Sequence, residues 1–238
     1  MKCRSIISMC VAVLTAAACG GDSGTQPVSG PRLANVRVIH ASLGAPGLRM
    51  RVGDSIVGGA IDFGEATPFQ MVEASGTLEA RHFIVGSTLF STTLALTPDS
   101  TFTLLVTGQP TAMTLVVGAD TARVPAPGTA KIRVIHSAES APDIDVFLTQ
   151  PGVASPVQLL PPFTFRTVGQ YQQGDPGDYV VSIQRADSTA AVLAQTDTLG
   201  LVPGDLRTVV VLDGAGGGLQ LAVFSDPTPP AALARTHT

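Results

Sequence analysis

Cysteine is nearly absent from this chain, and its scarcity limits the chemistry that the protein can perform. The sequence has 238 residues and three cysteines, Cys3, Cys10 and Cys19, all close to its beginning. We expect Cys3 and Cys10 to leave with a signal peptide and Cys19 to carry lipid, so that the folded part has no free thiol. Disulfides, cysteine nucleophiles and thiolate metal sites are then excluded, and the fold must depend on a hydrophobic core.

Charged and aromatic side chains are also scarce. Charged residues make up 13% of the chain, the formal net charge is −4, and Lys131 is the only lysine after Lys2. A weakly acidic chain without a basic patch is a poor nucleic-acid binder, so we predict no nucleic-acid partner. There is no tryptophan, and the two tyrosines are Tyr171 and Tyr179. This shortage weakens the case for glycan binding by aromatic stacking without excluding it.

Helical periodicity is missing as well. No segment has an amphipathic helical pattern over three turns, whereas short stretches rich in β-branched residues are separated by Gly and Pro. This pattern is typical of an all-β protein with many turns.

The first 18 residues have the features of a bacterial signal peptide. Lys2 and Arg4 precede an apolar run that is too short to span a bilayer, and small residues stand before Cys19. This ending resembles a lipobox, in which the cysteine thiol is lipidated, although Ala16 stands where leucine is usual. An ordinary secretory signal cut near Ala18 is the alternative. Several acyl chains on Cys19 would hold the protein on a membrane, and Gly20 after the cysteine favours an outer membrane where one exists.

One motif occurs twice. Arg-Val-Ile-His stands at Arg37–His40 and again at Arg133–His136, 96 residues later, and both copies are followed at the same distance by Ala-Pro. A recurrence at this period predicts a tandem pair of similar domains. The late segments Leu94–Asp99 and Leu199–Gly204 also correspond, but they lie 105 residues apart. We therefore expect extra residues in the second domain, in the loop near Gln150 to Pro156.

These observations predict an organisation and a fold. We expect two tandem antiparallel β-sandwich domains with an immunoglobulin-like layout and seven or eight short strands each, with a small barrel as the alternative. Gly58-Gly59 is read as a turn signal and Phe165–Tyr171 as a strand. The expected segments are a signal peptide (1–18), a lipidated flexible tether (19–33), domain one (34–123), a linker (124–128), domain two (129–226) and a disordered tail (227–238).

The repeated motif and the later stretch Gly177–Val181 together resemble the bacterial family called "domain of unknown function 4397". The resemblance covers residues 34–120 and 129–225, and it implies secreted or surface-anchored β-domains with no established activity. The family's aspartate before Ala-Pro is replaced by Gly44 and Ser140. Its aspartate in the next strand is kept as Asp145, whereas Arg49 stands in the first copy.

The motif histidines are the most tempting candidates for a site. A zinc site needs three or four ligands, and each repeat supplies one histidine, with Asp145 as a further candidate beside His136. We therefore predict no metal, and we expect each imidazole to hydrogen-bond the loop that leads to Ala-Pro. A structural role is predicted for the repeated residues Arg37, His40, Pro46, Arg133, His136 and Pro142.

The sequence contains no set of catalytic residues in a recognisable motif. We therefore predict a non-catalytic protein without a cofactor, anchored by lipid in the cell envelope, that binds a protein or glycan through loops at one end of the sandwiches. Two alternatives stay open. One is an envelope spacer, and the other is a metal-binding protein or hydrolase centred on His136 and Asp145 in the second domain.

Overall fold

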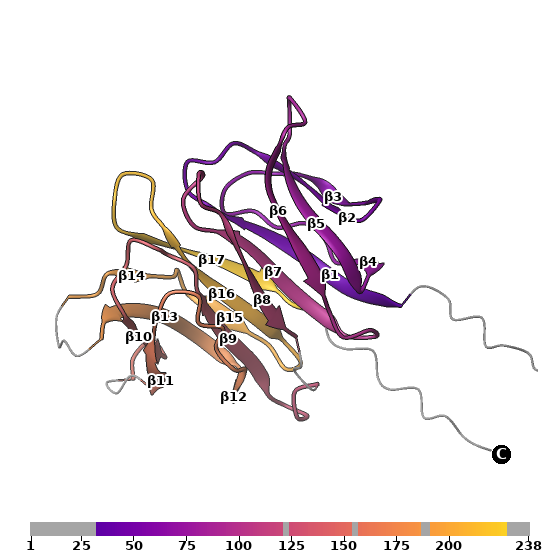
Figure 1. Cartoon of the computed structure of the whole chain (residues 1–238). Helices are drawn as coiled ribbons and strands as arrows, with labels where there is room; N and C mark the ends of the chain where they lie inside the picture. The colour runs from indigo at the N-terminus through magenta and orange to yellow at the C-terminus, as the bar shows by residue number, and fades with distance from the viewer. Residues whose placement is uncertain (1–31, 121–123, 154–156, 187–190, 228–238) are drawn as a thin grey trace, which may run out of the picture. The chain divides into compact units, whose positions relative to one another are not determined.

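A computed structural model describes residues 32–120, 124–153, 157–186 and 191–227, as Figure 1 shows. The predicted signal peptide, the lipid site at Cys19, most of the tether and the tail beyond Pro227 lie outside these residues. Pro31–Thr238 forms one compact unit, and the predicted domain bounds inside it stay a prediction. The described residues form strands and no helix, so none of them belongs to a helix able to cross a membrane. The prediction of an all-β sandwich fold is confirmed.

The described residues divide into two halves, 32–120 and 124–227, and the first half contains eight strands. These are β1 (Leu33–Ala41), β2 (Leu48–Val52), β3 (Ser55–Ile61), β4 (Gln70–Glu73), β5 (Ser75–His82), β6 (Thr88–Ala95), β7 (Thr101–Thr107) and β8 (Thr114–Ala119). They form one sheet in the order β4-β1-β7-β8 and a second in the order β3-β2-β5-β6. Buried apolar side chains from both sheets form a common core.

The second half repeats this topology. Its strands are β9 (Ala130–His136), β10 (Ile144–Thr149), β11 (Val157–Phe163), β12 (Gln172–Gly174), β13 (Gly177–Arg185), β14 (Ala194–Gln195), β15 (Leu199–Leu201), β16 (Leu206–Asp213) and β17 (Leu219–Ser225). One sheet has the order β12-β9-β16-β17, and in the other β11, β10 and β13 are neighbours while β14 and β15 both pair with β13. The two short strands take the place that β6 has in the first half.

The two strands that carry the repeated motif, β1 and β9, each have one parallel neighbour, whereas purely antiparallel sheets were expected. β1 pairs in parallel with β7, and β9 pairs in parallel with β16. In each half the chain passes through both sheets between these two strands, which run in the same direction. The remaining strand pairs are antiparallel.

The parallel strands are buried on both faces. In β1, Val36 and Val38 face the core of the first half, while Ile39 belongs to a separate apolar cluster. That cluster joins the two halves, since it contains Ile39 and Leu105 from the first and Ile135 and Val210 from the second. A strand covered on both faces gives a near-continuous apolar run in place of clean alternation. This explains why Arg-Val-Ile-His lacks polar positions open to water.

Two local predictions were wrong. Gly58-Gly59, read as a turn, lies inside β3, where the pairing with β2 has a register shift that accommodates both residues. Phe165–Tyr171, read as a strand, is a loop that touches β9 through a single bridge between Ile135 and Val168. Val168 of this loop packs against the apolar cluster that joins the halves.

Candidate functional site

The motif histidines hold the loops that follow their strands. His40 is fully buried, its Nε2 lies 3.1 Å from the Pro46 carbonyl oxygen, and its Nδ1 accepts a 3.3 Å hydrogen bond from the Ser42 amide. His136 repeats this arrangement with the Pro142 carbonyl at 3.4 Å and the Ala138 amide at 3.4 Å. Because Nδ1 accepts, Nε2 carries the proton and donates it to the carbonyl. Burial lowers the pKa of both imidazoles below 6.5, which favours this neutral form.

The structure does not join His136 and Asp145 into a shared site. Asp145 accepts a 3.1 Å hydrogen bond from the Gln158 amide, whereas His136 is occupied by the two backbone groups of its own loop. Among the described residues, no three His, Cys, Asp or Glu side chains gather as a metal would require. Both ring nitrogens of His136 already have partners, so neither is directed at an open space.

The motif arginines enter a buried network between the halves. Arg37 forms an ion pair with Asp226, and the two side chains are 3% and 1% exposed. The Arg37 Nε also donates a 3.0 Å hydrogen bond to the Thr103 hydroxyl. The guanidinium lies over the rings of Phe69 and Phe224, at 4.9 and 5.4 Å from their centroids. Charge, hydrogen bonds and stacking thus all fix this side chain.

Arg133 has the reciprocal arrangement. It forms a buried ion pair with Asp120, donates a 2.9 Å hydrogen bond from Nε to Thr208, and lies 4.5 Å from the centroid of the Tyr171 ring. Its Nη2 also donates to Thr103 at 3.1 Å, so that hydroxyl serves arginines from both halves. Each half therefore contributes an arginine that is neutralised by an aspartate of the other half.

The network is balanced in charge and well supplied with donors. Asp226 accepts 2.6 Å hydrogen bonds from the hydroxyls of Tyr171 and Thr208, in addition to its ion pair. Burial raises the pKa of the Tyr171 hydroxyl far above its usual value. Burial also raises the pKa of the Asp120 carboxyl, although the Arg133 guanidinium acts against that shift. The network fixes the joint between the halves, and it leaves no group directed at a ligand.

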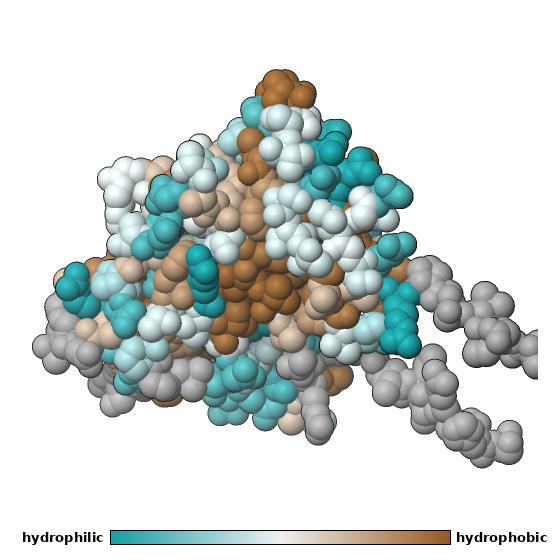
Figure 2. Space-filling model, in the orientation of Figure 1, coloured by the Kyte–Doolittle hydropathy of each residue, from teal (hydrophilic) through white to brown (hydrophobic). Residues whose placement is uncertain are grey.

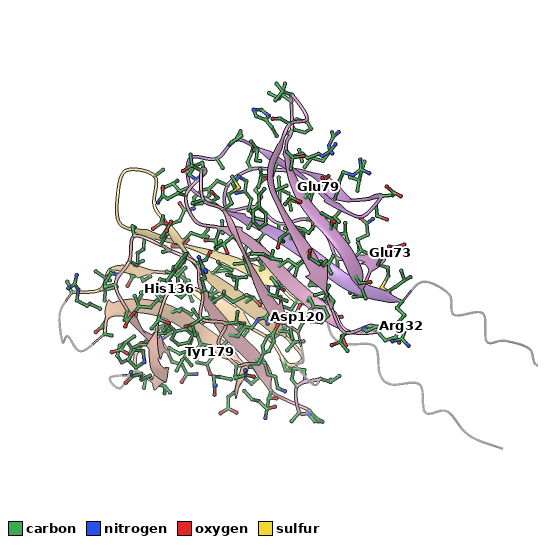
Figure 3. The ribbon with its side chains drawn as sticks, viewed as in Figure 1. Arg32, Glu73, Glu79, Asp120, His136 and Tyr179 are labelled. Carbon is green, nitrogen blue, oxygen red and sulfur yellow. The ribbon has the colours of Figure 1, made fainter. Side chains whose placement is uncertain are left out.

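Sequence reasoning missed both aspartates. Asp226 was only the last residue of the predicted second domain, and Asp120, which follows β8 (Figure 3), received no role. The spacing of the sequence could have identified the residues of this network as repeated positions. Thr103 and Thr208 lie 105 residues apart, which is also the separation of the late segments Leu94–Asp99 and Leu199–Gly204. Asp120 and Asp226 lie 106 residues apart, each just after the last strand of its half.

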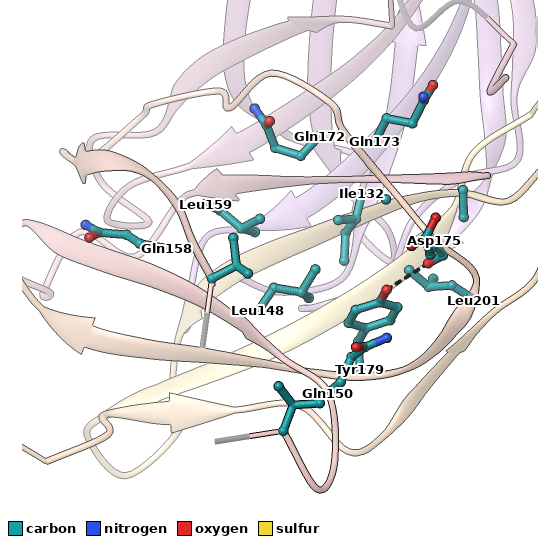
Figure 4. Close-up of a pocket in the computed structure, with 14 residues that line it drawn as sticks. Ile132, Leu148, Gln150, Gln158, Leu159, Gln172, Gln173, Asp175, Tyr179 and Leu201 are labelled. Carbon is teal, nitrogen blue, oxygen red and sulfur yellow. Dashed lines mark hydrogen bonds between the residues drawn. The ribbon is translucent and has the colours of Figure 1, made fainter. Parts of the chain in front are cut away.

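A pocket of about 290 Å³ lies at one end of the second half, between its two sheets (Figure 4). Its apolar lining comes from both sheets and includes Ile132, Leu148, Leu159, Tyr179 and Leu201. The Tyr179 hydroxyl donates a 2.8 Å hydrogen bond to the Asp175 carbonyl, so the ring is fixed in place.

Four glutamines supply most of the polar groups of this pocket: Gln150, Gln158, Gln172 and Gln173. A side-chain amide offers donors and an acceptor without net charge. Two of them are engaged, since Gln158 donates to Asp145 and Gln173 accepts from the Ala126 amide. Such a lining suits a small neutral ligand that has both hydroxyl or amide groups and an apolar face.

One substitution between the repeats explains why the pocket is open. Ala34 pairs with Val72 in the first half, and the corresponding Ala130 pairs with Gly174. Val72 is buried in the core of the first half, whereas a Cβ added to Gly174 would meet nothing within 4 Å. The β10–β11 loop is also longer than its counterpart and contributes Gln150 and Val153 to the lining. Extra residues were predicted in this loop, but the role of Gly174 was not.

These features define the chain as an all-β sandwich protein whose halves are joined by a buried charge network. Residues 34–147 match the model of the family described as Domain of unknown function (DUF4397), and this segment includes both copies of the motif. The match confirms the resemblance seen in the sequence over this segment, and the tandem pair of domains stays a prediction. No curated protein matches the chain significantly.

Solved structures give only distant likenesses. The Bacillus anthracis TIE protein is 7% identical with a TM-score of 0.26, and 76% of this chain covers 34% of that one. A leucine-rich repeat protein from Bacteroides thetaiotaomicron is 11% identical with a TM-score of 0.21, over 74% of this chain and 26% of that one. A family CBM26 module from Eubacterium rectale Amy13K, solved with maltoheptaose, is 12% identical with a TM-score of 0.25, over 82% of this chain and 97% of that one. This chain thus spans about a third or less of the first two. At these scores the likenesses carry no argument about function.

Proposed function

We propose that this protein is a non-catalytic binding module of the cell envelope that takes a neutral, hydroxyl-rich ligand, a glycan segment, into the pocket of its second half. The observation that carries the proposal is the opening at Gly174, where the first half has the buried Val72. The same fold thus appears once closed and once open within one chain.

The chemistry of the lining supports a glycan over an anionic ligand, since Asp175 lies among the glutamines of the lining. Glutamine amides can donate to and accept from hydroxyl groups, and the leucine and isoleucine side chains can cover the apolar face of a sugar ring. Tyr179 supplies an aromatic ring in the wall, although it is largely covered by its neighbours. A peptide could present similar groups and is the competing ligand in the test.

The decisive variant is Gly174→Val, which places in the second half the side chain that closes the first. The backbone at Gly174 is not in the left-handed region, and the added side chain enters open space, so we expect the variant to fold normally. Residues 31–238 of wild type and variant would be applied to an array of neutral envelope oligosaccharides and uncharged peptides. We expect that some glycan spots bind the wild type and that the same spots do not bind the variant.

Met71→Val is the matched control, since Met71 lies in β4, the first-half counterpart of β12, is exposed like its counterpart Gln173, and is not a residue of the pocket lining. It should leave the array pattern unchanged. Binding that is equal in wild type and Gly174→Val would contradict the pocket as the site. Binding confined to peptides would contradict the glycan.

The location in the envelope is a separate part of the proposal and depends on Cys19. Metabolic labelling with a fatty acid should mark the wild-type protein and not a Cys19→Ser variant. Label retained by Cys19→Ser, or absent from the wild type, would contradict the lipid anchor.

A rigid spacer is the second candidate, and the buried network favours it. Reciprocal ion pairs hold the two halves together through Arg37 and Arg133, as a spacer of fixed length would require. In that case no array ligand would bind, while loosening the joint would alter function in the cell.

A further inference from the structure

The hairpin between β5 and β6 ends in an apolar tip. Phe83, Ile84 and Val85 follow one another there, with 44%, 82% and 69% of their surfaces exposed. Figure 1 places this turn at the apex of the first half, and Figure 2 shows an apolar cap there. Single exposed apolar residues are ordinary on protein surfaces, but three in succession on a projecting turn mark an interaction site.

The tip is held in shape before anything binds it. The His82 carbonyl accepts the Gly86 amide at 2.9 Å, and the His82 Nδ1 accepts the Ile84 amide at 3.1 Å. Gly86 has a φ of 73°, a conformation that suits glycine. The Phe83 amide donates to the Gly47 carbonyl, which ties the turn to the neighbouring strand. A preformed tip loses little conformational freedom when it inserts into a partner.

Cationic side chains lie just below the apolar tip. The Arg49 guanidinium is 5.1 Å from the centroid of the Phe83 ring, and no carboxylate among the described residues pairs with this exposed arginine. Arg81 lies opposite Arg49 across the strand pair and forms an ion pair with Glu79. Asp62, exposed in the loop after β3, keeps this end of the sandwich from being uniformly positive. The apolar residues must therefore supply most of any attraction, and Arg49 the remainder.

We propose that the tip Phe83–Val85 inserts into a lipid surface that contains anionic headgroups. The order from the apex downward, apolar residues first and the unpaired Arg49 next, matches the order of acyl chains and phosphates that an entering loop meets. A groove on a protein would accept the apolar residues but gives no reason for an arginine beside the phenyl ring. The insertion goes beyond glycan binding, does not depend on it, and would add a membrane contact far along the chain from Cys19.

The lack of tryptophan in the chain makes the test direct, because one introduced indole is the only such reporter. Residues 31–238 carrying Ile84→Trp would be mixed with vesicles of equimolar phosphatidylethanolamine and phosphatidylglycerol. We expect the emission to move to shorter wavelength and to be quenched by lipids brominated on their acyl chains. Ile56→Trp on β3, where Ile56 is 48% exposed, is the matched control and should show neither change.

Sedimentation with the same vesicles measures the strength of the contact. Ile84→Ser should lower vesicle partition by at least about tenfold, because several methylene groups no longer leave water. Arg49→Gln should lower it less, and only when phosphatidylglycerol is present. Unchanged emission from Ile84→Trp, or equal changes at positions 84 and 56, would overturn the proposal. A protein captured by the tip without any effect of vesicles would also overturn it and assign the tip to that protein.

Discussion

Replacing Asp226 by alanine removes a buried carboxylate that three side chains share. Arg37 loses its ion pair, and the hydroxyls of Tyr171 and Thr208 lose an acceptor at 2.6 Å. The arginine stays buried between two aromatic rings, so it cannot easily turn to water. The variant therefore leaves an uncompensated charge and two unsatisfied donors inside the joint between the halves.

The expected loss of stability is large for one substitution. Breaking a buried ion pair by removing one partner costs about 3–5 kcal/mol. For a unit of this size that loss should lower the melting temperature by roughly 10 °C. The assay is urea unfolding of residues 31–238 followed by far-ultraviolet circular dichroism, with the free energy of unfolding extrapolated to water.

Two further variants show whether the ion pair is the cause. Asp205→Ala removes the partner of Arg207 in a half-exposed pair and should cost less than about 1 kcal/mol. Arg37→Met combined with Asp226→Ala should cost less than the sum of the single changes, since the two residues interact. An Asp226→Ala variant as stable as Asp205→Ala would refute the reasoning, because it would mean that the carboxylate is not buried against Arg37.

Three more predictions concern the motif and its network. Because burial lowers the pKa of His40 and His136, the unfolded chain takes up protons that the folded chain does not once the pH falls below about 6.5, so the free energy of unfolding should fall as the pH drops below that value; urea titrations that give equal free energies at pH 7.5 and at about pH 5.5 would contradict this. Thr103→Val should cost about 1–3 kcal/mol, because donors from both arginines lose their shared acceptor; a melt unchanged from wild type would exclude the shared role. In a Tyr179→Phe variant, the remaining Tyr171 should stay protonated at pH values where free tyrosine ionises, because burial raises its pKa, and an ordinary phenolate absorbance titration would show this to be wrong.

Local sequence patterns were sufficient for many of the strands. Short stretches rich in β-branched residues between turns were predicted to be strands, and β6 and β7 are such stretches. The hydrogen bonds of His40 to its following loop could also be anticipated. A histidine at a strand end, beside a loop with exposed carbonyl groups, has few other partners.

Long-range pairing could not be read in the same way. Parallel pairing of β1 with β7 depends on how the chain crosses between sheets, which no local pattern records. The joint between the halves was missed because Arg37 and Arg133 look like surface residues until their partners, far along the chain, are known. The pocket depends on Gly174, whose significance emerges when the register places it opposite Ala130, as Val72 lies opposite Ala34.

The most direct test of the central claim is the thermal melt of residues 31–238 with a neutral glycan, in wild type and in Gly174→Val. A ligand at 100 times its dissociation constant adds about 2.7 kcal/mol, which should raise the wild-type melting temperature by roughly 5–10 °C. The account predicts this rise in the wild type and none in Gly174→Val, with both proteins melting alike when no glycan is present. Equal rises in the two proteins, or no rise in the wild type with any neutral envelope glycan, would contradict the pocket as a binding site.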